Sequence, residues 1–172
     1  MGTLIQATTD YSSYQLAKII DAVAAIEADL SNVNNVYEFG AIPNSFTGVT
    51  APFVLHMPAA YRPNRWSGAG DRWRRLIVFY SAIMCIDRSK HQAMQYPASF
   101  EEAQLLGDVY FDTFAETPNG TTAFDNRTTI CAAAGLEDLT LEDLTFGPMI
   151  EVGAEDWVGW VATFQAKIWI QS

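Results

Sequence analysis

The longest uninterrupted apolar run, LIVFYSAIMCI at residues 76–86, constrains the fold more than any other feature. It contains no charged residue, glycine or proline, and β-branched and aromatic side chains are frequent in it. At 11 residues it is too short for a transmembrane helix and is typical of a strand buried on both faces. A second apolar run occupies residues 53–57, and the connection between the two contains glycines. Together the runs predict a long β-hairpin.

The connection between these two runs is basic and aromatic. Five of the ten lysines and arginines lie between positions 62 and 75, together with two tryptophans. Because arginine and tryptophan are enriched at binding hot spots, one interpretation is an interaction surface at the hairpin tip. The other is that the tryptophans pair across the hairpin while the arginines are solvated or meet acids of the same chain. The candidate interaction residues are Arg62, Arg65, Trp66, Arg72, Trp73, Arg74 and Arg75.

The chain is acidic, with a formal net charge of −10 in 172 residues. Proteins that wrap DNA are normally basic, so this balance argues against nonspecific DNA binding. A hydrophobic content of 49% argues against global disorder, and the length suits one domain spanning residues 1–172. Of the 20 acids, 13 lie between positions 101 and 156, far along the chain from the basic segment. This polarity suits a protein that meets different partners on different faces.

Three segments show helical patterns. Residues 12–30 carry an apolar stripe at 3–4 spacing, and Ser12 with Gln15 has the pattern of a capping box. Residues 99–114 show the same kind of pattern, with Ser99 and Glu102 as a second capping box. A short helix is expected at residues 128–134, ended by Gly135.

The remaining segments are expected to be strands and connections. Residues 157–170 alternate strictly and predict a strand, preceded by a second strand at 149–152 and a turn. Residues 36–51 predict a short strand and a loop, and residues 1–11 an irregular lead-in. Residues 136–148 predict an acidic surface segment whose leucines reach inward. Because strands cluster instead of alternating with helices, we expect an α+β fold with a mainly antiparallel sheet and a long hairpin, packed by two main helices.

Motifs for chemistry are absent from the sequence. His56 and His91 stand alone, outside any HxH, HExxH or CxxC pattern, and are expected to be a hydrogen-bonded strand residue and a solvated loop residue. Neither GxSxG nor GxxxxGK[ST] occurs. Cys85 and Cys131 are expected to be buried free thiols. We therefore expect no catalytic, cofactor-binding or metal-binding residues; an enzyme with a dispersed site using His56 or Cys85 is the alternative.

The N-terminus, MGTLIQATTD, has no basic region and no long apolar core, so no signal peptide is expected. No apolar run reaches the length of a membrane-spanning helix. We therefore expect a soluble chain made in the cytosol, with no membrane partner.

The order of these segments resembles the tail terminator (tail-completion) proteins of long-tailed bacteriophages. Members of that family open with an amphipathic helix, as at residues 12–30, followed by a strand and a long hairpin with a polar or charged tip, as at 53–86. A helix that packs on the sheet follows, as at 99–114. A closing strand pair ends the layout, as at 149–152 and in GWVATFQAKIWI. The resemblance covers most of the chain. This chain is longer than many members of the family, with the extra length at residues 36–51 and 117–148.

This resemblance implies a structural virion protein of the phage neck, made in the host cytoplasm. It implies a homo-hexameric ring that caps the tail tube and joins it to the head-side connector or head-closure protein. No catalysis and no cofactor are implied, and DNA would pass through an acidic lumen without specific binding. Related neck and tail proteins share similar elements, so a head-closure or tail-tube subunit is the second assignment.

Overall fold

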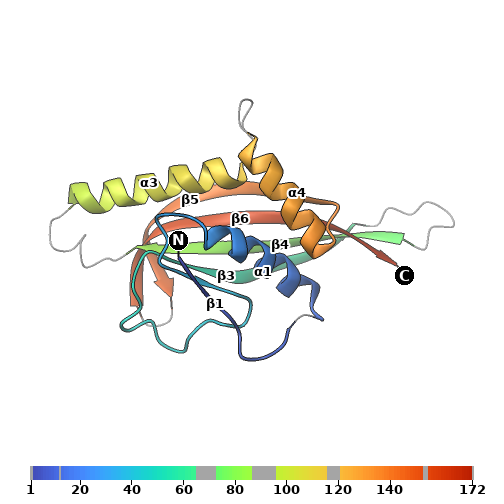
Figure 1. The fold of residues 1–172 in the computed structure, drawn as a ribbon, viewed down its shortest axis with the longest axis horizontal. Coiled ribbons are helices and arrows are strands. Elements are labelled where there is room, and N and C mark those ends of the chain that lie inside the picture. Colours follow the sequence, from blue (N-terminus) through green and yellow to red (C-terminus); the bar gives the residue numbers. More distant parts are fainter. Residues whose placement is uncertain are drawn as a thin grey trace.

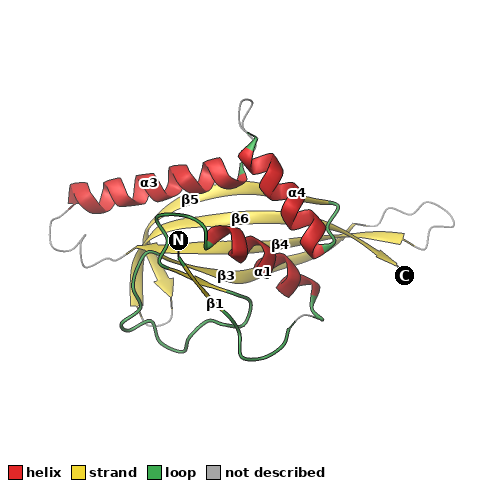
Figure 2. Cartoon of the chain, viewed as in Figure 1, coloured by secondary structure: helices red, strands yellow, loops and turns green. Residues whose placement is uncertain are grey.

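The computed structural model describes residues 2–11, 13–64, 73–86, 96–115, 121–152 and 155–171. These residues form a mixed α+β fold in which three helices cover one face of a six-stranded sheet (Figure 1, Figure 2). In chain order the elements are β1 (Thr3–Ile5), α1 (Gln15–Glu27), β2 (Asn35–Tyr37), β3 (Phe53–Asn64), β4 (Trp73–Ile86), α3 (Tyr96–Phe114), α4 (Thr122–Ala134), β5 (Asp138–Val152) and β6 (Glu155–Gln171).

The sheet is mixed, with the strand order β1-β2-β3-β4-β6-β5. The pairs β3–β4, β4–β6 and β5–β6 are antiparallel, whereas β1–β2 and β2–β3 are parallel. The expectation of a mainly antiparallel sheet is therefore confirmed only in part. The difference arises at the N-terminus, where the predicted irregular lead-in forms β1. The chain crosses over through α1 and returns as β2 beside it, and such a helical crossover makes two strands parallel.

The predicted long hairpin is confirmed by the antiparallel pairing of β3 with β4. Its register runs from Phe53 opposite Cys85 to Asn64 opposite Arg75. Strand β3 is longer than the apolar run because it continues through both Pro58 and Pro63. The register shifts between Pro58 and Ala60. Ala59 is the residue left out of the ladder at this bulge, and Pro58 lies beside it. Prolines within strands are tolerated at bulges, where the regular ladder is already interrupted.

Residues 138–152 form one long strand, which confirms the strand predicted at 149–152 and extends it back through the predicted acidic surface segment. Glu142 and Asp143 are exposed, as expected for that segment, but the strand there was not predicted. A register shift between Leu141 and Asp143 explains why strict alternation was hidden in this sequence. Leu139 is buried, and Leu141 and Leu144 pack against the core from either side of that bulge, so the prediction that these leucines reach inward is confirmed. The prediction for β6 is also confirmed, because its alternating residues are buried: Ala162, Phe164, Ala166 and Ile168.

The helix starts differ from the predicted capping boxes. Helix α1 begins after Tyr14, which makes no side-chain capping hydrogen bond, and Gln15 Nε2 instead donates to the Ala134 carbonyl oxygen at 2.6 Å. Helix α3 begins at Tyr96, so Ser99 lies inside it and does not cap it. Helix α4 has 13 residues and makes a third main helix where two were expected. Its end at Gly135 is confirmed by the left-handed φ of 66° there.

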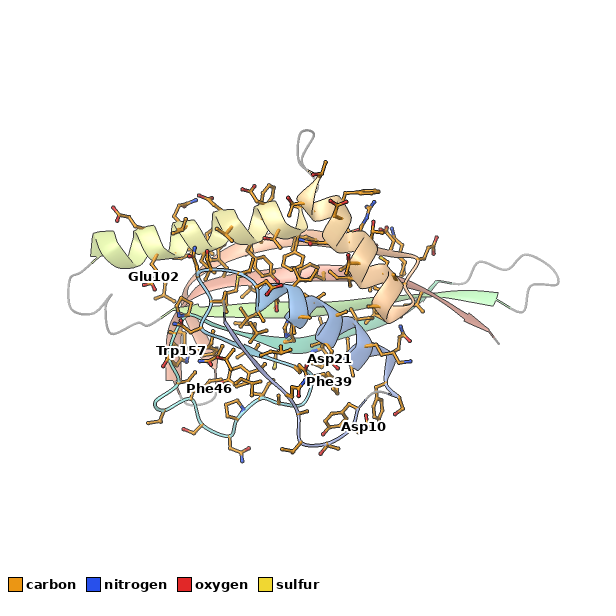
Figure 3. The ribbon with its side chains drawn as sticks, in the orientation of Figure 1. Asp10, Asp21, Phe39, Phe46, Glu102 and Trp157 are labelled. Carbon is orange, nitrogen blue, oxygen red and sulfur yellow. The ribbon has the colours of Figure 1, made fainter. Side chains whose placement is uncertain are left out.

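Two apolar clusters cover the two faces of the sheet. The larger lies under the helices, where buried residues of α1 and α3 such as Ile20 and Leu106 pack with Val54 and Phe164 of the sheet. The smaller lies on the other face, where the rings of Phe46 and Phe53 stack at 5.1 Å and that of Trp157 meets Phe53 edge-on at 4.8 Å. Figure 3 places Phe46 and Trp157 near each other at one end of the sheet. The loop between β2 and β3 therefore covers this face.

Helix α3 approaches the sheet most closely at Trp160 of β6. The indole Nε1 donates to the Ala103 carbonyl oxygen at 2.7 Å. One turn further on, a Cβ atom at Gly107 would lie 2.6 Å from Cε2 of the indole ring. The absence of a side chain at this position therefore lets the helix seat on the tryptophan.

We expect Gly107→Ala to destabilise the protein by about 1–3 kcal/mol, because the methyl group overlaps the Trp160 ring. The sign is informative, since alanine ordinarily stabilises a helix interior by about 1 kcal/mol relative to glycine. Urea denaturation measures the change, and the exposed Leu105→Ala on the same helix is the control, with an expected effect within about 0.5 kcal/mol. If Gly107→Ala is as stable as the wild type or more stable, the Trp160 ring does not prevent a side chain at this position.

Candidate functional site

Four of the seven predicted interaction residues lie in described strands. Arg62 is near the end of β3, and Trp73, Arg74 and Arg75 begin β4. We call these four residues the hairpin end. In Figure 1 the strands β3, β4 and β6 continue past the helices at this end of the sheet. Three predicted residues, together with His91, lie outside the described residues: Arg65, Trp66 and Arg72.

A buried polar cluster joins three elements beneath the helices. His56 of β3 is 3% exposed, and Glu27 of α1 and Tyr110 of α3 are each 0% exposed. His56 Nε2 lies 2.9 Å from Glu27 Oε2, and the Tyr110 hydroxyl donates to Glu27 Oε1 at 2.5 Å. His56 Nδ1 lies 3.1 Å from the carbonyl oxygen of Tyr37 on β2. The cluster therefore connects α1, α3 and two neighbouring strands.

The surroundings of His56 favour its charged form. Burial lowers the pKa of His56, but the negative charge of Glu27, the hydrogen bonds to Glu27 and Tyr37, and the more distant Asp21 together raise that pKa above its ordinary 6.5. Carbonyl and carboxylate oxygens can only accept, so an imidazolium, which has an N–H on each nitrogen, suits both contacts better than a neutral ring does. The prediction that His56 is a hydrogen-bonded strand residue is confirmed. Its contacts lie inside the core, where they hold the helices on the sheet.

The sequence contains a signal for Glu27 that pattern reading missed. Glu27 follows Val23 by four positions and Ile20 by seven, which places its side chain on the apolar stripe of α1. A carboxylate at such a position is rarely buried without a partner. Its partners could not be assigned from the sequence, because His56 and Tyr110 are distant along the chain and only the fold brings them together.

A groove with a volume of about 410 Å³ lies between α3 and β5. We call it the α3–β5 groove. It has an apolar part and an acidic part. The phenyl ring of Phe111 on α3, which is 46% exposed, belongs to the apolar part. The apolar side chains are Phe111, Leu141, Leu144 and Trp160. The carboxylates are Asp108, Glu142 and Asp143, and none of the described lysines or arginines lines the groove.

The groove lies beside an edge of the sheet. Strand β5 is last in the strand order, and among the described strands only β6 pairs with it. The register shift between Leu141 and Asp143 leaves Glu142 as the extra residue of the bulge, next to the groove. Gln104 Nε2 donates to Asp108 Oδ1 at 2.8 Å, and the Thr145 hydroxyl donates to Asp143 Oδ2 at 2.5 Å. These hydrogen bonds orient two of the three carboxylates without neutralising them.

A second, smaller hollow of about 190 Å³ is also acidic, with Asp10, Asp21 and Glu38 in its lining. Figure 3 labels Asp21 beside Phe39, with Asp10 below them in the view. Burial raises the pKa of Asp21 and of Glu38, while the Phe39 amide donates to Asp21 Oδ1 at 3.1 Å. Within the described ranges, no three histidine, cysteine or acidic side chains are placed to hold a metal ion. This hollow therefore lacks the geometry of a metal site.

Cys131 is a free, half-buried thiol, and burial raises its pKa. This confirms a free thiol at that position, while the side chain of Cys85 lies outside the described part. Among the helices that the structure describes, none combines the length and apolar character needed to cross a bilayer.

No protein-family model matches the chain, and no curated protein is similar to it. A function must therefore be inferred from the fold and from the two surfaces described above, the hairpin end and the α3–β5 groove.

We expect the free energy of unfolding to fall as the pH rises from about 6.5 through the raised folded-state pKa of His56. The stabilisation by protonated His56 is complete below the unfolded-state pKa and is lost as the folded protein releases the proton. In Glu27→Gln the carboxylate is gone and burial lowers the pKa of His56, so the slope should reverse. Urea denaturation at a series of pH values measures both slopes.

Tyr110→Phe is the matched control for this pair. It removes the hydrogen bond to Glu27 Oε1 but keeps the charge pair, so it should cost about 1 kcal/mol and keep the wild-type slope. Equal slopes in the wild type and Glu27→Gln would show that the Glu27 charge does not control the titration of His56.

Proposed function

We propose that this chain is a structural virion protein of the phage neck, the tail terminator of a long-tailed bacteriophage. Its copies would form a ring that caps the tail tube and joins it to the head-side connector. The observation that carries the proposal is the arrangement of four parts. Helix α1 follows the short strand β1, the β3–β4 hairpin extends past the helices, α3 packs on the sheet, and the pair β5–β6 closes it (Figure 1). This is the order in which the family arranges its elements.

A ring protomer needs two different surfaces that fit each other, because head-to-tail contacts generate closed rings. Two such surfaces are available here. One is the hairpin end, which carries three of the ten lysines and arginines of the chain. The other is the edge strand β5 with the α3–β5 groove, which carries carboxylates. An edge strand offers backbone donors and acceptors to a neighbouring chain.

The charge of the chain supports passage of DNA through such a ring. The formal net charge is −10 per copy, so an assembly of several copies is strongly acidic. A lumen of that sign repels the phosphate backbone and lets DNA slide without specific binding. The proposed function is structural: the ring caps the tail tube and connects it to the head-side connector.

We expect purified protein, in the presence of tail tubes, to form a species of about six copies of the 19.0 kDa chain at the tube end. Light scattering across a concentration series gives the mass of the free protein, and electron microscopy of tubes mixed with protein gives the position of the ring. Density at one end of each tube is the expected image. Unchanged tube ends at saturating protein would refute the terminator assignment. Rings that stack into tubes of their own would indicate a tail-tube subunit instead.

A further inference from the structure

We propose that the α3–β5 groove of one copy binds the hairpin end of a second copy. The occupant of the groove is thus a basic and aromatic segment of this same chain. The inference deepens the proposed function. It rests on that function in one respect, because it assumes that the same contact, repeated from copy to copy, produces a ring. It adds which surfaces meet and which side chains carry the specificity.

The chemistry of the groove selects for such a segment. Phe111, at 46% exposed, and the indole of Trp160 offer aromatic surface, while three carboxylates surround it. Apolar surface favours an aromatic partner, and carboxylates favour arginine, which can form two parallel hydrogen bonds with one of them. The hairpin end contains one tryptophan and three arginines: Trp73, Arg62, Arg74 and Arg75.

A hairpin cannot fill the groove of its own chain. At the groove, Leu144 of β5 pairs with Ala162 of β6, whereas Trp73 at the hairpin end pairs with Gln171 of β6. These two positions on β6 are nine residues apart, which is about 30 Å along a strand. A regular strand cannot fold back over that distance, so the contact must join different copies. It is a head-to-tail contact. In a pair of copies, the hairpin end of one copy and the groove of the other are still free to bind further copies.

The overall charge explains why a local match is needed. Two copies with a net charge of −10 each repel one another at long range. The hairpin end holds three of the ten cations of the chain and no acid, so it is well suited to approach a cluster of carboxylates. Charge complementarity of this kind selects the partner surface and sets the orientation of docking.

Salt dependence separates this contact from an apolar one. Screening weakens the general repulsion between acidic copies, so added salt would strengthen self-association through apolar surfaces alone. Arginine–carboxylate pairs are weakened by the same screening. We expect self-association to weaken by about tenfold or more between 50 and 500 mM salt, because several such pairs form at each contact.

Charge reversal tests the contact directly. The groove variant is Glu142→Lys/Asp143→Lys, and the hairpin variant is Arg74→Glu/Arg75→Glu. Each should weaken self-association about tenfold or more, as measured by sedimentation over a concentration series. The variant with all four changes should recover most of the loss, because the two reversed surfaces attract each other. This recovery separates a direct contact from a general effect of charge.

The control variant is Glu101→Lys/Asp125→Lys, which changes the net charge as much as the groove variant does. Both acids are exposed and lie outside the groove lining, so association should not weaken. Circular dichroism and urea denaturation of every variant establish that it folds. Equal weakening by the control and groove variants would overturn the inference.

Two further outcomes distinguish the inference from the proposed function. If wild-type protein forms rings and none of the reversals affects them, the groove–hairpin contact is refuted and the ring stands. If the free protein stays monomeric at every concentration but the groove variant no longer binds tail tubes, the groove receives the tube protein and the second-copy occupant is refuted. A monomer that also leaves tube ends uncapped refutes both.

Discussion

The buried pair of Glu27 and His56 is the interaction on which the rest of the structure depends. One carboxylate accepts hydrogen bonds from the Tyr110 hydroxyl and lies against the His56 ring, so a single group ties α1 to both α3 and β3. Burying two charges costs several kcal/mol, and that cost is offset only when the contacts are complete. A slip of β3 by one residue would turn His56 to the other face of the sheet and leave Glu27 buried without its partner. The pair therefore specifies the packing arrangement more than it adds net stability.

The position of α3 follows from this pair and shapes the groove. Ala103, Gly107 and Tyr110 lie on one face of the helix, at spacings of four and three residues. Tyr110 is held by Glu27, and the Ala103 carbonyl oxygen accepts from the Trp160 indole. With these two contacts made, the adjoining flank of α3 carries Asp108 and Phe111, which line the groove beside β5 together with Gly107. An internal ion pair thus fixes, through one helix, the geometry of a surface that the solvent reaches.

Strong local patterns predicted the correct elements, and weaker ones did not. The run at residues 76–86 and the alternation before Gln171 predicted β4 and β6, because full burial on one or both faces leaves a clear pattern. Strand β1 has three residues and is stabilised by pairing with β2, which no local pattern can show. Only the end of β5, at residues 149–152, was predicted, because the bulge interrupts the alternation earlier in the strand. The starts of α1 and α3 were wrong because tertiary contacts and preceding residues decided them in place of the Ser-x-x-Gln and Ser-x-x-Glu patterns.

The hairpin end could be predicted from the sequence, whereas the α3–β5 groove could not. A concentration of arginine along the chain is visible in the sequence, so the hairpin end was found there. The groove combines residues from α3, β5 and β6 that are distant in sequence, and its acids look like an ordinary solvated face until the fold places apolar side chains beside them. Finding such a site requires the strand register, which depends on a bulge.

The sheet also determines how two copies would be related. The hairpin end and the groove both lie along the strands β4, β6 and β5, and the continuous 17-residue strand β6 passes both of them. Neighbouring strands rotate by roughly 20–25° in a twisted sheet, so the direction of the hairpin end relative to the groove is fixed by the backbone. Each copy added through this contact therefore turns by the same angle as the one before it. A constant turn set by a rigid sheet is what a head-to-tail contact needs in order to close into a ring, whereas a flexible connection would give chains of variable length.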